Sequence, residues 1–421
     1  MQMDRPAWKT RVSTLMWGGA LIVLGMAVGA TPGFADNCGC GSGCVDMANC
    51  PAPVPVLETL GGHSLFWHDP CGGGYIDRDR DCLFHNSTPP LWYASAEFLP
   101  LMRDQRGSQP FQAIAIEQIN DTTTYDRQAV LGTNDFNNNF EPGFRVTLGR
   151  ALGDWYRIEG SYFGTHNWSD QAQVHYREPV GGDVEGNMLS PLSNFGNPGG
   201  LPGLYTLTED EWNPQPGLDF NRNAHIQFES RLNNAELNLR RRVRTAIDPQ
   251  VRAETSCLVG LRYMGIDELF EYNDTNHDVR VKTGNNMFGI QIGALSQFLV
   301  VDRGWIDFEI KGVMFFNDAS NRIESRVQNV PELTAAQAYS PTREQAHRTA
   351  FMGDLSLMFN YQVAPAWTFR LGYNAMWLSG VALASENFLV DVNTLVSGPG
   401  ALDASGRVVY HGPTIGMVLA R

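Results

Sequence analysis

Histidine, serine and carboxylate side chains are the first residues of this sequence to consider for chemistry. Hydrolysis on a β-barrel would need a histidine that acts as a general base beside a serine or aspartate. The histidines in predicted loops have no matching serine or aspartate on an adjacent predicted strand. They are His166, His175, His225, His277 and His347. The sequence therefore predicts that the chain is not an enzyme.

Oxygen ligands recur at alternate positions in two short segments, as they do in calcium-binding loops. Residues 134–139 and 274–278 are rich in Asn and Asp. Neither has the glycine and the distal glutamate of the twelve-residue calcium pattern. Asn and Asp are also common in turns for backbone reasons alone. We predict no metal and no cofactor.

Six of the seven cysteines lie before residue 83, and an even number in an exported segment suggests disulfides. Their spacing fits no standard zinc pattern, and the sequence leaves their pairing open. The disulfide candidates are Cys38, Cys40, Cys44, Cys50, Cys71 and Cys82. The seventh, Cys257, lies alone within a predicted strand.

The N-terminus has the three parts of a secretory signal. Basic residues Arg5, Lys9 and Arg11 precede an apolar stretch over 12–30, and small residues follow at 33–35. A transmembrane anchor is the alternative, because the apolar stretch could just span a bilayer. We expect residues 1–35 to be a cleaved signal peptide, 36–90 a Cys-, Gly- and Pro-rich periplasmic segment, and 91–421 a barrel.

The charge balance excludes one class of partner. The chain carries a net charge of −14, and the signal peptide carries +2, so the exported chain would carry −16. Nucleic-acid binding depends largely on basic contacts to phosphates. We therefore predict no nucleic-acid partner.

The elements that must position any site are strands with an alternating pattern. In the segment 367–375, Trp367, Phe369, Leu371 and Tyr373 alternate with polar residues, so one face is apolar and the other polar. Similar segments are predicted at 92–102, 143–150, 155–164, 232–243, 256–266, 286–299, 305–315, 351–361, 367–378 and 408–420. Short and long connections alternate between them, and aromatic residues lie near both ends. This pattern is typical of outer-membrane barrels.

The predicted fold is therefore an all-β, closed antiparallel transmembrane barrel of about ten strands, with eight to twelve compatible with the pattern. Short turns would face the periplasm and long loops the exterior. The apolar faces would contact lipid and the polar faces would line the lumen. The charged lumen-lining candidates are Glu97, Arg145, Arg157, Glu159, Glu236, Arg240, Arg262, Asp307, Glu309, Lys311, Asp354 and Arg370. They could form a structural ion-pair network or a selectivity lining for a solute path.

Several segments resemble the β-barrel porin-7 family of bacterial outer membranes. They include GFRVTLGRALGDWYRIEGSYFG, LNNAELNLRRRV and SCLVGLRYMGIDELFEY, together with FGIQIGALSQFLVVDRGWIDFEIKGVMFFNDASNR and FMGDLSLMFNYQVAPAWTFRLGYNAMWLSG. The resemblance covers about residues 90–421. It implies a bacterial outer-membrane location and a porin role.

We therefore expect a passive function, as a porin for small solutes or as a structural barrel of the cell envelope. The expected partners are outer-membrane lipids and the barrel-assembly machinery. One alternative is a surface adhesion or binding barrel that acts through its long loops. Another is a secreted soluble β-sandwich, in which the same apolar faces would form an interior core.

Overall fold

A computed structural model of the protein describes the barrel region of the chain. The described residues are 91–105, 110–119, 123–136, 139–153, 155–175, 188–193, 195, 207–208, 219, 221–243, 253–275, 277–301, 303–327, 342–388 and 402–420. The predicted signal peptide, the periplasmic segment and its six cysteines lie outside these residues and stay predictions.

The described residues are almost entirely β-strands. The barrel wall contains β1 (Trp92–Phe98), β2 (Leu101–Gln105), β5 (Phe140–Glu141), β6 (Phe144–Leu152), β7 (Tyr156–His175), β10 (Asn223–Val243), β11 (Ala253–Asp274), β12 (His277–Val301), β13 (Gly304–Val327), β14 (Thr342–Ala364), β15 (Trp367–Val381) and β16 (Gly406–Ala420). A second sheet contains β3 (Pro110–Ile119), β4 (Thr123–Gly132), β8 (Met188–Leu189) and β9 (Leu207–Thr208), and a 3₁₀ turn, η2, spans Thr133–Asp135.

The wall closes on itself because the first strand pairs with the last. The order runs β1, β6, β7 and then β10 to β16, all antiparallel, and β1 pairs with β16 through a register from Tyr93↔Ala420 to Phe98↔Ile415. After a break at Leu99–Pro100, β2 continues this pairing along β16, and β5 pairs with β2. This closure leaves no strand edge in the membrane region, where unpaired backbone groups are costly. The prediction of a closed barrel of about ten strands is confirmed.

The apolar residues of the strands lie on the outer surface of the barrel. Val146 and Leu148 on β6, Ile290 on β12, Met314 on β13 and Leu357 on β14 each expose more than half of their surface. In water this arrangement would be unfavourable, whereas in hydrocarbon it is what a membrane barrel requires. We call this outer band the apolar belt. Its position contradicts the alternative of a soluble sandwich, in which these residues would be buried.

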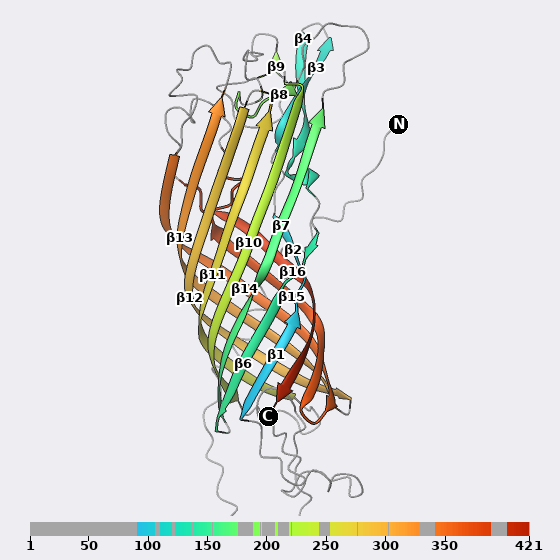
Figure 1. Ribbon diagram of the computed structural model, residues 1–421, viewed down its shortest axis with the longest axis vertical. Coiled ribbons are helices and arrows are strands. Elements are labelled where there is room, and N and C mark those ends of the chain that lie inside the picture. Colours follow the sequence, from blue (N-terminus) through green and yellow to red (C-terminus); the bar gives the residue numbers. More distant parts are fainter. Residues whose placement is uncertain are drawn as a thin grey trace, which may run out of the picture. The chain divides into compact units, whose positions relative to one another are not determined.

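Strands β7 and β10 to β14 continue well beyond the apolar belt and are longer than β15, β16, β1 and β6. Figure 1 shows β7 and β10 to β13 rising past the upper ends of the shorter strands. The sequence-based boundaries were therefore too short at this end. β11 ends at Asp274 and β12 begins at His277, so the connection between them, predicted to be long, is short. No helix among the described residues has the length and apolar content needed to cross a membrane.

Candidate functional site: the barrel lumen

The inward faces of the strands carry charged residues at the level of the apolar belt. Successive side chains of a strand point to opposite faces, so the residues between the outer apolar positions must face the lumen. The structure places all twelve sequence-predicted charged residues inside the barrel, buried or partly buried. We call this group the ionic layer. Its placement is a structural observation, while a role in lining a solute path stays a prediction.

Ion pairs in the ionic layer connect strands that are not neighbours in the wall. Arg240 Nη2 on β10 lies 2.8 Å from Glu309 Oε1 on β13, and Arg370 Nη1 on β15 lies 2.7 Å from Glu97 Oε1 on β1. Arg240 Nη2 also contacts Glu159 Oε2 at 2.9 Å. Neighbouring strands pair edge to edge, so contacts between distant strands must cross the lumen. These side chains therefore bridge the interior space.

Arg262 is the most enclosed member of the ionic layer. Its side chain is fully buried, and its Nη1 lies 2.9 Å from Asp354 Oδ2 and 3.4 Å from Glu236 Oε1. Its Nε donates a hydrogen bond of 2.6 Å to Asn234 Oδ1. Lys311 Nζ approaches Glu236 Oε2 from the other side, at 3.2 Å. Each buried charge in this group thus has a partner of opposite sign, as burial requires.

The ionic layer balances its own charge. Six of the twelve residues are basic and six are acidic. A cavity of ≈ 100 Å³ remains among them, lined in part by Tyr93, Glu97, Arg145 and Arg370. A ring of one sign would favour ions of the opposite sign, but this layer presents both signs. The described residues at this level form a network with a small cavity.

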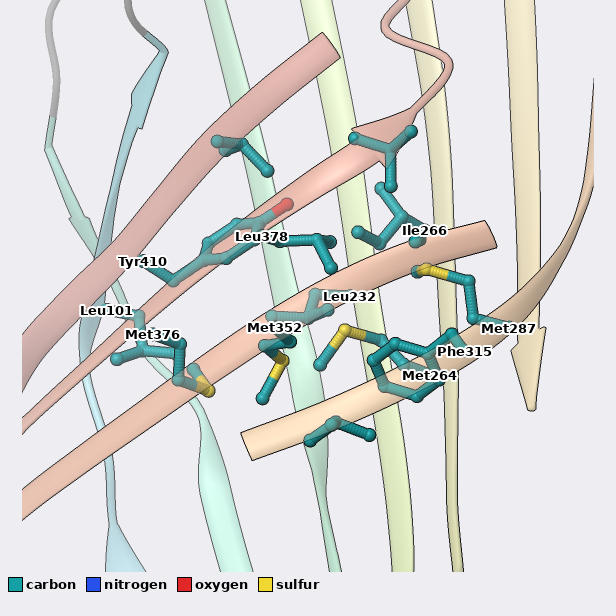
Figure 2. Close-up of a cluster of buried hydrophobic side chains, with 14 of the residues drawn as sticks. Leu101, Leu232, Met264, Ile266, Met287, Phe315, Met352, Met376, Leu378 and Tyr410 are labelled. Atoms are coloured by element: carbon teal, nitrogen blue, oxygen red, sulfur yellow. The ribbon is translucent and has the colours of Figure 1, made fainter. Parts of the chain in front are cut away.

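A cluster of buried apolar side chains lies directly above the ionic layer. Its members occupy inward positions next to the charged ones on the same strands, for example Met264 beside Arg262, Val313 beside Lys311 and Met352 beside Asp354. Figure 2 shows four methionines of this cluster gathered in one interior region. We call it the methionine layer, and it contains Leu99, Leu101, Phe163, Trp168, Leu232, Met264, Ile266, Met287, Val313, Phe315, Ala350, Met352, Met376, Leu378, Val381, Leu383, Val408 and Tyr410. Methionine suits this location because it fills irregular spaces.

The segment that follows β15 folds into the barrel, where it contributes Leu383 to the methionine layer and continues above it. We call residues 382–388 the inner segment, all but one of which are buried. Asn285 on β12 holds it with two bonds: its Nδ2 donates to Ala382 O, and its Oδ1 accepts from Ala382 N, each at 2.8 Å. Ala384 N donates to Glu268 Oε2 at 3.0 Å. Glu268 is itself ion-paired with Arg103, so the inner segment is tied to both sides of the wall.

An aromatic cluster covers the inner segment at the upper level of the wall. The ring of Phe388 lies 5.1 Å from that of Phe111, 5.7 Å from that of Phe270 and 5.6 Å from that of Tyr272, all in edge-to-face geometry. This geometry is favourable for aromatic pairs. The inner segment therefore packs against apolar groups below and aromatic groups above. It was not predicted from the sequence, which indicated only a long loop between β15 and β16.

A buried Asp–His pair lies at the β11–β12 turn, above the apolar belt. His277 Nδ1 is 2.6 Å from Asp274 Oδ1, and the His277 backbone N–H donates to the same oxygen at 2.9 Å. The Tyr272 hydroxyl donates to Asp274 Oδ2 at 2.9 Å, and burial followed by the Asp274 charge raises the pKa of Tyr272 well above its ordinary value. The prediction that the loop histidines have no matching serine or aspartate on an adjacent strand is therefore wrong for His277, and also for His347, whose Nδ1 lies 3.3 Å from Asp318 Oδ1 on β13. The side chains of Asp274 and His277 are both fully enclosed.

Together, a closed antiparallel wall, an apolar outer belt and a charged interior define the chain as an outer-membrane β-barrel. Among solved structures it is similar to the outer membrane protease OmpT from Escherichia coli, with 11% identity, 79% of this chain and 98% of that chain covered, and a TM-score of 0.39. It is also similar to the CymD monoaromatic hydrocarbon channel (7% identity, 79% and 89% covered, TM-score 0.26) and to the Pseudomonas putida toluene transporter TodX (6%, 80% and 90%, TM-score 0.23). These likenesses concern the barrel fold alone.

Neither a family model nor a curated protein matches the chain, so membership of the β-barrel porin-7 family stays a prediction. The prediction that the chain is not an enzyme is corrected, because a protease is among the barrels that it resembles. In the part of the chain that the structure describes, no group of three or more His, Cys, Asp or Glu residues could hold a metal ion.

Proposed function

We propose that this protein is an outer-membrane channel for small solutes that is closed in the conformation described here. The inner segment is the movable part in this proposal. The observation that supports the proposal concerns the part of the chain that fills the lumen. The inner segment enters the lumen from the connection between β15 and β16 and is not part of the continuous wall. Hydrogen bonds of Asn285 and Glu268 tie its backbone to the wall.

Opening would require the inner segment to leave the lumen and the side chains beneath it to rearrange. The four methionines of the methionine layer are unbranched and flexible, so they can repack more easily than branched residues. The ionic layer already contains a cavity of ≈ 100 Å³. Because this layer carries equal numbers of acidic and basic residues, we expect weak selectivity for the sign of a solute's charge.

A structural barrel of the cell envelope is the second candidate function. The observation that favours it is the paired state of the ionic layer, in which Arg262, Lys311 and Arg370 each contact two carboxylates. Such a network fastens opposite walls together and would resist the movement that a channel needs. The two candidates differ in whether weakening the inner segment produces conductance.

Conductance across planar bilayers tests the proposal. We expect the wild type to open rarely and Asn285→Ala to open about five- to 150-fold more often, because losing two buried hydrogen bonds destabilises the closed state by about 1–3 kcal/mol. Thr283→Ala is the matched control: Thr283 is buried on the same face of β12, two residues away. It should behave like the wild type. If all three proteins insert and none conducts, the channel is ruled out in favour of the structural barrel.

A further inference from the structure

Three basic residues form a continuous row on the outer face of the tall strands. Lys282 on β12 lies opposite Arg322 on β13, and Arg322 lies opposite Arg343 on β14. All three side chains are exposed. Each of the three lies an even number of residues from an outward-facing phenylalanine of the apolar belt on the same strand. These are Phe288, Phe316 and Phe351, so the row faces away from the lumen. Directly opposite residues have Cβ atoms about 4.5–5.5 Å apart.

This row places three like charges side by side, an arrangement that a bound anion would stabilise. Like charges directly opposite on a sheet destabilise it, and here three lie side by side in a strongly acidic chain. Arg322 Nη2 has one ion pair, with Glu324 Oε1 at 2.7 Å. Among the described residues, no ion pair involves Lys282 or Arg343. Two of the three cations of the row therefore have no carboxylate within ion-pair distance. The nearby carboxylates Asp267 and Glu271 lie diagonally opposite Lys282 on β11, and Glu271 pairs with Arg280.

The height of the row indicates what kind of anion could reach it. On β13 the last exposed apolar residue is Phe316, and Arg322 follows six residues later on the same face. At about 3.3 Å per residue and a tilt of roughly 40°, the row lies about 15 Å beyond the edge of the apolar belt. The headgroup region of a simple phospholipid extends only about 5–8 Å beyond the hydrocarbon. A lipid with a large, phosphate-bearing sugar headgroup would reach the row, whereas a simple phospholipid would not.

We propose that Lys282, Arg322 and Arg343 bind phosphate groups in the headgroup of a phosphorylated glycolipid of the outer leaflet. The apolar belt below would contact the acyl chains of the same lipid, so the site continues the lipid-facing surface of the barrel. Arg side chains suit this role because a guanidinium binds phosphate through two parallel hydrogen bonds, and Lys adds a point charge. The site is independent of whether the lumen conducts.

Binding of a defined lipopolysaccharide to the full chain in detergent tests the proposal. The site variant carries Lys282→Gln, Arg322→Gln and Arg343→Gln. The matched control carries Arg231→Gln, Arg326→Gln and Arg348→Gln, which are also exposed residues of the tall strands and remove the same charge. We expect the site variant to bind at least about tenfold more weakly and the control to stay within about twofold of the wild type.

The chemical source of the binding is separated by two further probes. The enzymatically dephosphorylated lipopolysaccharide should bind the wild type as weakly as the intact lipid binds the site variant. Vesicles of phosphatidylglycerol should not distinguish the wild type from the site variant, because their phosphates lie too low. Equal losses in the two triple variants, equal binding of the dephosphorylated lipid, or a phosphatidylglycerol preference that depends on the row would each overturn the proposal.

Discussion

Arg262→Met is expected to lower the free energy of unfolding by about 3–5 kcal/mol, because it leaves the buried Asp354 carboxylate without its partner and removes one of the two cations at Glu236. Arg262 is fully buried, and its guanidinium neutralises Asp354 at 2.9 Å and Glu236 at 3.4 Å. Methionine is shorter but of similar volume, so the loss of charge should dominate over the loss of packing. Urea unfolding of the protein in lipid vesicles, followed by tryptophan fluorescence, gives the measurement.

Two further variants establish the cause of this loss. Adding Asp354→Leu to Arg262→Met should recover a large part of the stability, because the nearest orphaned carboxylate is then removed. Arg231→Met serves as the control, since Arg231 is exposed on β10 and hydrogen-bonds only at the surface, to Asn167 Oδ1 at 3.2 Å. We expect a change below about 0.5 kcal/mol there. A loss at Arg262 no larger than that at Arg231 would mean that the ionic layer does not stabilise the barrel.

Leu357→Arg is expected to destabilise the membrane-inserted barrel by about 2–4 kcal/mol, the cost of a cation on the lipid face near the bilayer midplane. Leu357 lies within the apolar belt of β14, and 52% of its surface is exposed. Gln345→Arg is the matched control, because Gln345 has the same outward parity on the same strand but lies beyond the belt. The control should fold and insert like the wild type.

The same unfolding measurement in vesicles decides this prediction, together with the yield of folded protein after insertion. Similar losses for Leu357→Arg and Gln345→Arg would show that depth in the membrane has no effect. Gly372 is unsuitable as an inward control, because a Cβ there would collide with the backbone of Leu357 and the side chain of Met358. A comparison of two outward positions avoids this steric effect.

The wall of the barrel could be predicted from the sequence because the membrane imposes one consistent pattern. On β10, Ala235, Leu237 and Leu239 face lipid and the residues between them face the lumen. Above the belt the pattern inverts: Ala224, Ile226 and Phe228 are buried inside, and polar residues face water. The apolar residues therefore lie on the outer face in the lower part of the strand and on the inner face in the upper part. Because of this switch, the alternating pattern of outward apolar residues ends at the edge of the belt. The upper halves of the strands were therefore predicted as loops.

The inward direction of the charged residues could be predicted from the alternation of side chains along each strand, but their ion-pair partners could not. Arg240 and Glu309 are on strands separated by two others, and only the curvature of the closed wall brings them together. The inner segment was missed for a different reason. It has no regular period, and its location depends on hydrogen bonds to Asn285 and Glu268, which lie about a hundred residues away in the sequence.

Solvent and lipid accessibility along β14 test most directly the central claim, that hydrocarbon contacts the outer face and a filled interior lies behind it. Nitroxide labels at position 357 and, separately, 358 would be compared in vesicles for relaxation by oxygen, which concentrates in lipid, and by a water-soluble nickel complex. Leu357 is half exposed on the outside, whereas Met358 is 2% exposed and faces the lumen. We predict strong oxygen relaxation at 357 and weak relaxation by both reagents at 358. Strong nickel relaxation at 357, or oxygen relaxation of equal strength at both positions, would contradict the account.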